Sequence, residues 1–345
     1  MRKALYVLTS LTTMDAITLF VSQIIGPFPS IVPLGNPTAY RNIYVHVPVS
    51  ISTYILFTAG FLLALACLIK GEERYEKLAH LFITAGLLVG ISTLITGAIW
   101  AYESWGSPWN WDPRETGVLM MVLSFSVYLA IRSGVEDPDV RSKVSMVFAV
   151  ASYATIPLSF SIPYVMPSLH PTFIETSKFL ESGVALTLFG SRLVVVPLEI
   201  SLIIFLARYV KKVPLTVVPV VAAVALIAIL QVPPNLAGGG TLKVRVLSGS
   251  YDGNTLTLNV SYGGGGYLLV YHGKPPITPV YAIFKGRRLF TLRNYWLSVD
   301  GTLKDGVIEA NDVRIIPYWG NVVNSLVYAV MLILLSIWIV KSGKS

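Results

Sequence analysis

Hydrophobic positions along the chain fall mainly into long blocks, and short polar segments separate these blocks. Eight blocks are long and apolar enough to cross a hydrocarbon layer of roughly 30 Å as helices of ~20 residues. Their length and composition therefore predict membrane-spanning helices. The predicted spans are residues 4–28, 46–70, 78–101, 115–132, 144–166, 190–209, 213–231 and 321–340.

The hydrophobic pattern changes to a period of two between residues 242 and 316. Alternation is clearest in "LKVRVLS" (242–248), "TLTLNVSY" (255–262) and "YLLVYHG" (267–273), and glycine-rich segments separate these runs. Later runs are "PVYAIFKG", "YWLSVDG" and "VIEANDVRII". The pattern predicts five or six short strands in a small β-barrel or sandwich of ~75 residues.

The predicted fold class is an all-α polytopic membrane bundle of about eight transmembrane helices, six forming the core, with an inserted small β-barrel. The predicted domains are a six-span core (1–210), a seventh transmembrane helix (211–231), the β-domain (232–319) and a C-terminal transmembrane anchor (320–345).

Composition agrees with a membrane protein. Of the 345 residues, 54% are hydrophobic and 13% are charged, whereas about a quarter are charged in ordinary soluble domains. The single cysteine, Cys67, excludes an internal disulfide and any CxxC site. The net charge of +8 does not indicate nucleic-acid binding, because in the first 212 residues most basic side chains lie between the apolar blocks, where they set topology.

The basic segments predict the orientation. Residues 1–3, 70–77, 132–143, 208–212 and 341–344 all fall on one side, which the positive-inside rule assigns to the cytoplasm. The opposite, extracytoplasmic side then receives residues 29–45, 102–114, 167–189 and 232–320. We therefore expect a multi-pass plasma-membrane protein whose β-domain lies outside.

One outer segment, "WGSPWNWDPRET" (105–116), is too aromatic for an ordinary loop and too charged for a span. Its indoles could form an interfacial aromatic belt, because tryptophan is common at membrane surfaces. They could equally form a flat platform for a large planar ligand with a polar edge, with Asp112 and Arg114 bonded to each other. Both interpretations are compatible with the physical chemistry of this segment alone.

Two histidines favour the ligand platform. His46, in "IYVHVPVS", and His170, in "MPSLHPT", both lie at the predicted outer ends of spans. Two opposed imidazoles could fill both axial positions of a haem iron. His80, at the other end of a span, and His272, in the β-domain, are better explained as a helix-end residue and a strand residue.

Four further charged residues are candidates for function. Asp15 and Glu199 lie inside predicted spans, where an acid is costly. We expect them to hold helices together through hydrogen bonds. Arg41 and Arg192 lie toward the outer side and are candidate partners for haem propionates.

The tryptophan-rich segment resembles the WGxxWxWDxRxT signature of the haem-handling proteins of cytochrome c maturation. "NIYVHVPVS" and "SFSIPYVMPSLHPT" resemble the two histidine segments of the CcmC branch, and "GAIWAYES" resembles the CcsA branch. The resemblance covers about residues 1–210. It implies that His46 and His170 are the axial ligands of haem b (iron protoporphyrin IX). It also implies that the haem contacts the segment containing Trp105, Gly106, Trp109, Trp111, Asp112 and Arg114.

The β-domain contains a second resemblance. "LLVYHGKPP" and "GTLKDGVIEANDVRI" are similar to CcmE, an OB-fold haem chaperone. The stretch "RIIPYWGN", where that family carries a haem-binding histidine or cysteine, has neither residue; Tyr318 is available there. The last span is loosely similar to the single-span partner CcmD.

These observations predict a haem carrier with no catalytic residues of its own. It would bind haem at the outer face and deliver it to a CcmE-like chaperone or to apocytochrome c, and an ABC-type maturation complex is a further candidate partner. The alternative is a CcsA-like synthase that forms the thioether bonds itself. A third interpretation, outside haem chemistry, is a transporter or membrane scaffold. Lipid is an expected partner and nucleic acid is not.

Overall fold

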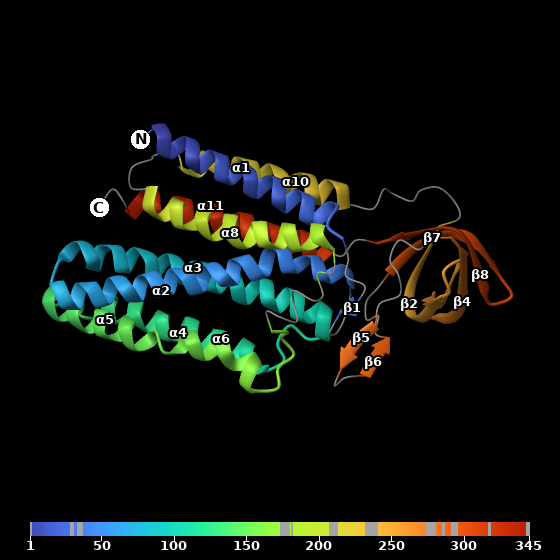
Figure 1. The fold of residues 1–345 in the computed structure, drawn as a ribbon, viewed down its shortest axis with the longest axis horizontal. Helices are drawn as coiled ribbons and strands as arrows, with labels where there is room; N and C mark the ends of the chain where they lie inside the picture. Colours follow the sequence, from blue (N-terminus) through green and yellow to red (C-terminus); the bar gives the residue numbers. More distant parts are fainter. Residues whose placement is uncertain are drawn as a thin grey trace.

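The structure is a computed structural model, in which a helical bundle lies beside a small β-barrel (Figure 1). It describes residues 2–27, 31–32, 37–172, 180, 182–206, 213–231, 241–273, 281–284, 287–290, 296–316 and 319–342.

Seven of the eight predicted spans are confirmed as helices that are long and apolar enough to cross a membrane. The fifth span is divided into two helices, because Pro157 cannot donate the backbone hydrogen bond that would continue the first one. The helices are α1 (Arg2–Ile24), α2 (Ile43–Lys70), α3 (Glu73–Trp105), α4 (Pro113–Gly134), α5 (Pro138–Ser152), α6 (Thr155–Val165), α8 (Gly183–Leu206), α9 (Val213–Thr216), α10 (Val218–Gln231) and α11 (Trp319–Ser342), with a 3-10 helix η1 (Pro37–Asn42) before α2.

The remaining predicted span, residues 213–231, which is the seventh along the chain, does not form one continuous helix. It consists of the four-residue α9 and the 14-residue α10. Pro219 explains the break, because it lacks the N–H that a continuous helix needs and disfavours helical geometry in the residue before it. At 1.5 Å per residue α10 is about 21 Å long, which is shorter than the hydrocarbon layer. It packs alongside α1 (Figure 1).

The pair α2–α3 forms the centre of the bundle and separates two apolar cores. One core joins this pair to α1, α8, α10 and α11, and the other joins it to α4, α5 and α6. Glycines allow the two central helices to approach closely. A Cβ at Gly60 would lie 2.6 Å from the Ile83 side chain, and one at Gly86 would lie 2.8 Å from the Phe57 ring. Small residues are the usual means of close helix packing in membranes.

The C-terminal region contains a closed five-stranded barrel of order β2-β3-β4-β8-β7. Only the β4–β8 pair is parallel among the five pairs of the barrel. Alternate residues point inward, as the period of two predicted, and Val244, Leu258 and Val299 belong to its apolar interior. The strands are β2 (Thr241–Tyr251), β3 (Thr255–Tyr262), β4 (Gly265–His272), β7 (Trp296–Lys304) and β8 (Val307–Ile315).

A second, small sheet was not predicted. The expected strand in "PVYAIFKG" forms β5 (Tyr281–Phe284) outside the barrel. It pairs with β6 (Arg287–Phe290) and, in parallel, with β1 (Ile31–Val32) from the segment after α1. The barrel insertion is thereby joined to the helical region at the end of the bundle nearest the barrel, which we call the barrel end (Figure 1).

Candidate functional site

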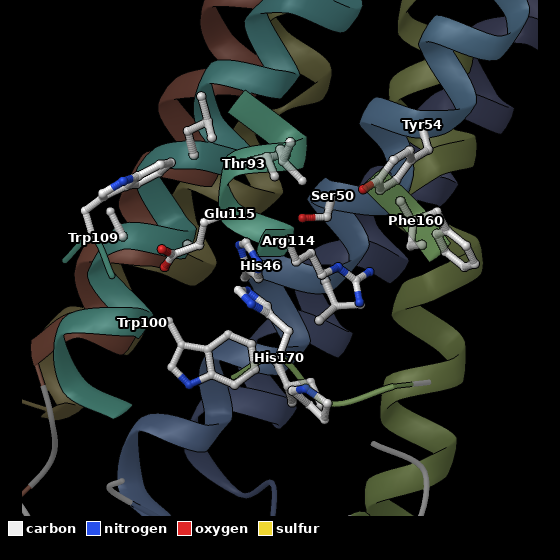
Figure 2. A pocket seen from close by; sticks show the side chains of 18 of the residues that line it. His46, Ser50, Tyr54, Thr93, Trp100, Trp109, Arg114, Glu115, Phe160 and His170 are labelled. Atoms are coloured by element: carbon white, nitrogen blue, oxygen red, sulfur yellow. The ribbon is translucent and has the colours of Figure 1, made fainter. Parts of the chain in front are cut away.

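A cavity opens at the barrel end of the bundle, and both predicted iron ligands line it. His46 comes from the first turns of α2 and His170 from the segment after α6. Figure 2 shows the two imidazoles next to one another at this cavity. The cavity volume is about 1030 Å³ with its solvent-open part included, which is at the upper end of the usual range for small-molecule sites. A smaller cavity of about 440 Å³ also contacts both histidines.

His46 is held by α3. Its Nδ1 lies 3.0 Å from the hydroxyl oxygen of Thr96, and its ring meets the indole of Trp100 edge-on at 5.7 Å. Gly97 provides space for the ring, because a Cβ at that position would lie 2.9 Å from the imidazole Cε1. With Nδ1 engaged, the other ring nitrogen, Nε2, is the atom left to bind a ligand in the cavity.

His170 is held by the carboxylate of Asp112. Its Nδ1 lies 2.8 Å from Asp112 Oδ1, and the same carboxylate accepts hydrogen bonds from the Ser168 hydroxyl at 2.9 and 3.0 Å and the Leu169 backbone N–H at 2.6 Å. The edge of His170 also packs on Trp105, with ring centroids 4.9 Å apart. A histidine that binds a metal commonly donates its other N–H to a carboxylate in this way.

Asp112 has a second role as the N-cap of α4. Its side chain accepts a hydrogen bond from the backbone N–H of Arg114 at 3.0 Å, and Pro113 occupies the first helical position. The expected pair between Asp112 and Arg114 therefore uses the Arg114 backbone, and the guanidinium lies over the Phe160 ring instead. The prediction of a charge-assisted bond between these two side chains was wrong in this detail, because the carboxylate is bonded to the His170 segment.

The pKa of Asp112 reflects these bonds. Burial by itself raises the pKa, but the hydrogen bond from His170, the charge of that imidazole, and the bonds from Leu169 and Ser168 outweigh burial and lower it from 3.8 to about 2. Asp112 is therefore ionised at neutral pH. An ionised carboxylate on Nδ1 fixes the ring orientation and makes Nε2 a stronger electron donor.

The loop between α3 and α4 is held by its own polar groups. Gly106 ends α3 in the left-handed conformation, at a φ of 84° that suits glycine. Ser107 donates to the Trp109 carbonyl at 2.8 Å, and the Asn110 backbone N–H donates to Glu115 at 3.0 Å. The loop thus presents its indoles from a fixed backbone.

The residues of the predicted aromatic platform do not all line the same cavity. Trp109 and Arg114 line the larger cavity, and Trp105 lines the smaller one. Trp111 points outward, with 75% of its surface exposed, and meets Trp109 edge-on at 5.8 Å. Its φ of 54° is unusual for a bulky residue. Contact between Trp111 and a ligand stays a prediction.

The two arginines expected to bind propionates have other partners. Arg192 is fully buried and its Nη1 lies 2.8 Å from Asp15 Oδ1. The expectation of an outer position was wrong because α8 begins at Gly183, so Arg192 lies nine residues, about 14 Å, into the helix. Arg41 donates to the carbonyl oxygens of Gln23 and Gly26 at the end of α1.

The outcome differs among the remaining candidates. Glu199 was expected to bridge helices through hydrogen bonds, but its buried carboxyl has no hydrogen-bond partner among the described residues. Asp15 links α1 to α8 and α11, as expected of a helix-bridging acid. His80 lies 3.3 Å from the Tyr128 hydroxyl at the end of the bundle opposite the barrel. His272 lies on the barrel surface, 3.0 Å from the hydroxyl of Thr255. Tyr318 lies outside the described residues.

Several residues of the site were not predicted from the sequence: Thr96, Gly97, Trp100 and Ser168. Gly97 gave a signal, because a glycine within a helix costs about 1 kcal/mol relative to alanine and usually has a packing reason. Glu103, in the last turn of α3, is a further unexpected residue. It is 1% exposed, and neither carboxylate oxygen has a hydrogen-bond partner among the described residues.

The fold and cavity define a class of protein: a polytopic membrane protein that presents two oriented imidazoles at one end of its bundle. Comparison with known proteins shows what this part of the chain is similar to. Residues 2–170 match the Cytochrome C assembly protein family. The match ends at His170 and so contains both histidines and the tryptophan-rich loop.

Individual relatives agree. The chain is 31% identical over 148 residues to heme exporter protein C of Rhodobacter capsulatus, covering 41% of this chain and 61% of the relative. It is 32% identical over 119 residues to the Paracoccus denitrificans protein of the same name, covering 32% and 49%. It is 40% identical over 74 residues to the cytochrome c biogenesis protein CcsA of Synechococcus sp., covering 21% and 24%. The chain thus spans less than two thirds of the length of each of these relatives.

Proposed function

We propose that the chain binds haem b as cargo in the larger cavity, with Nε2 of His46 and of His170 at the two axial positions. One observation carries the proposal. Each ring has its Nδ1 engaged by a neighbouring side chain, Thr96 or Asp112, and both rings line the same cavity. Two histidines with purely structural roles have no reason to converge in this manner.

The surrounding residues suit a porphyrin. Trp109 and Phe160 supply apolar contact surface, and Trp105 supports His170 from the side. Arg114 lines the cavity and carries the positive charge that a haem propionate would bind. Gly106 and Asp112 hold the loop that presents the indoles, with Trp111 at its exposed tip.

We further propose that the site faces the extracytoplasmic side of the plasma membrane and passes haem on for cytochrome c maturation. The basic segments 70–77 and 132–143 lie at the opposite end of the bundle, which the positive-inside rule assigns to the cytoplasm (Figure 1). Filled axial positions disfavour oxygen chemistry and suit carriage of haem. The recipient would be a CcmE-like chaperone or apocytochrome c, within or beside an ABC-type maturation complex.

The test is the absorption spectrum of the detergent-purified protein loaded with haem. Wild-type protein should give a low-spin spectrum typical of two imidazole ligands. His46→Ala and His170→Ala should each convert it to a high-spin spectrum or lose haem. The matched controls are His80→Ala and His272→Ala, which remove the chain's other two histidines and should leave the spectrum unchanged. Retention of the low-spin spectrum in His46→Ala or in His170→Ala would refute the two-histidine site.

The similarity to CcsA favours a second candidate, a synthase that attaches haem itself. In that reaction a cysteine S–H adds across each haem vinyl group, so that the sulfur and the hydrogen both stay in the product and no oxidant is needed. Expression in cells lacking all other maturation components distinguishes the two. Covalent cytochrome c formed by this chain alone would establish the synthase, and its absence would leave the carrier.

The β-barrel has two proposed roles. It is either an OB-like relative of the haem chaperone that no longer binds haem covalently or a docking module for the recipient. The barrel lies beside the end of the bundle where α2, the helix of His46, begins, and this position supports both roles (Figure 1).

A further inference from the structure

A buried charged network lies behind His46, and the proposed function does not use it. Arg192 of α8, Asp15 of α1 and Tyr328 of α11 are all fully buried. The guanidinium Nη1 lies 2.8 Å from Asp15 Oδ1, and the Tyr328 hydroxyl donates to Asp15 Oδ2 at 2.9 Å. Charges inside a membrane bundle are costly and usually have a specific task.

The same guanidinium reaches α2. Nε of Arg192 donates a hydrogen bond to the backbone carbonyl of Tyr44. In a regular helix this carbonyl accepts the N–H of the residue four positions later, which here is Pro48. Proline has no N–H, so the Tyr44 carbonyl lacks an intrahelical donor. Arg192 supplies the donor that Pro48 cannot.

This bond lies next to the proposed iron ligand. Tyr44 is two residues before His46, between the start of α2 at Ile43 and Pro48. A proline inside a helix is a common point of kinking, because the hydrogen bond that would hold the preceding turn is missing. The direction in which the His46 side chain projects from α2 therefore depends on which donor replaces that hydrogen bond.

Helix α11 contacts two of the groups that hold His46 in position. Tyr328 holds Asp15, and Asn324, one turn earlier on α11, donates to the backbone carbonyl of Thr96 at 3.2 Å. Thr96 is the residue whose hydroxyl contacts His46 Nδ1. Helix α11 lies beyond the part of the chain that matches the family, and it nevertheless stabilises both contacts behind the proposed ligand.

We propose that Arg192 is a positioning residue for haem binding: by bonding the carbonyl that Pro48 leaves unpaired, it fixes the first turns of α2 and the direction of the His46 imidazole. Asp15 and Tyr328 hold the guanidinium in place for this task. The proposal rests on the proposed function, in which His46 binds haem iron.

Removing an ion pair with a purely structural role would also destabilise the folded protein. The test therefore uses a variant that removes both charges together, and a further substitution that should restore haem binding. The double variant Asp15→Asn/Arg192→Met removes both charges and the donor to Tyr44. We expect the dissociation constant for haem to rise ~10- to 100-fold, as for loss of groups that orient metal ligands, and the low-spin spectrum to weaken. Adding Pro48→Ala returns an N–H at the position that bonds Tyr44. This triple variant should recover the low-spin spectrum and most of the affinity.

The matched control is Glu76→Gln/Arg132→Met, which removes an ion pair of 2.7 Å near the opposite end of the bundle. It should leave haem affinity unchanged. Wild-type affinity and spectrum in the Asp15/Arg192 double variant would overturn the proposal, and so would failure of Pro48→Ala to restore them. If the double variant does not fold, the triple variant provides the test: recovery of the low-spin spectrum supports the proposal, and its absence overturns the proposal. His46→Ala is measured alongside, because a wild-type spectrum in that variant would refute the proposed function itself, whatever the Arg192 variants show.

Discussion

The carboxylate of Asp112 lies 2.8 Å from Nδ1 of His170, although 58 residues separate the two along the chain. This contact joins the tryptophan-rich loop to the segment after α6. Because the same carboxylate caps α4, the ring of His170 is fixed relative to a helix end and not merely to a loop. The two features that the sequence presents separately, the loop and the second histidine, thus form one structural unit.

Replacement of Asp112 by asparagine should weaken haem binding. The amide keeps the size of the carboxylate and much of its capping ability, but it removes the negative charge that orients the His170 imidazole and strengthens it as an electron donor. We expect a ~10-fold or greater rise in the dissociation constant for haem, measured by titration in detergent. Asp137, which caps α5 at the opposite end of the bundle through two backbone N–H groups, provides the control. Asp137→Asn should leave haem affinity unchanged, and equal losses in both variants would contradict a specific role for Asp112.

The lowered pKa of Asp112 predicts a dependence of stability on pH. A carboxyl whose pKa falls from 3.8 to about 2 on folding stabilises the folded state above the unfolded pKa. That contribution is lost as the pH falls from about 4 toward 2, and its full size is about 2 kcal/mol. Thermal unfolding of the wild-type protein should therefore depend on pH in this range more strongly than that of Asp112→Asn. If the unfolding temperatures of the two proteins depend on pH in the same way, the Asp112–His170 contact does not form.

The sequence was sufficient to predict seven of the eight membrane-spanning helices, because length and hydropathy depend on short stretches of chain. It also placed His46 and His170 at one end of the bundle, since orientation alternates from span to span. It could not identify the partner of Asp112. That choice depends on where the end of α6 lies relative to α4, and Arg114, two residues away in sequence, was the nearer but incorrect candidate.

The role of Arg192 shows a second limit of the sequence. Hydropathy placed the start of its span at residue 190, whereas α8 begins at Gly183. A shift of seven residues moves a side chain about 10 Å along a helix axis, from the surface to the interior. Pairing with Asp15, 177 residues away, depends on tertiary packing and has no local signal. The sequence shows Pro48, but it does not show that Arg192 donates to the Tyr44 carbonyl, which Pro48 leaves without a helical donor.

Gly97 should be essential for the position of His46. A Cβ there would lie 2.9 Å from the imidazole Cε1, so Gly97→Ala should displace the ring and weaken haem binding. Helix propensity by itself favours alanine by about 1 kcal/mol, so the variant should remain folded. Gly190 is the control, because a Cβ at that position in α8 meets no atom within 4 Å. Titration with haem should show loss of affinity for Gly97→Ala and none for Gly190→Ala; unchanged affinity in Gly97→Ala would show that the ring tolerates the methyl group.

Glu103 should reduce the stability of the bundle. Its carboxyl is buried, and neither oxygen has a hydrogen-bond partner among the described residues. Burial of an unpartnered polar group costs roughly 1–3 kcal/mol. Glu103→Met, similar in length and apolar, should therefore raise the thermal unfolding temperature. Glu76→Met should lower it, because Glu76 is bonded to Arg132 and Ser142. A lower unfolding temperature for Glu103→Met would show that its carboxyl stabilises the folded state.

Trp111 should contribute to haem binding at a cost in stability. Its left-handed backbone, with a φ of 54°, is unfavourable for a bulky side chain by roughly 1–2 kcal/mol, and its indole is 75% exposed. Trp111→Gly relieves the strain, so we expect equal or higher thermal stability together with faster loss of haem to a soluble acceptor. Asp305→Gly is the control, because Asp305 is another non-glycine residue with a positive φ, 50°, and lies in a turn of the barrel. Asp305→Gly should raise the thermal stability without changing the rate at which haem is lost. Unchanged haem loss in Trp111→Gly would show that the strained indole does not contact the cargo and would confine the platform to Trp105 and Trp109.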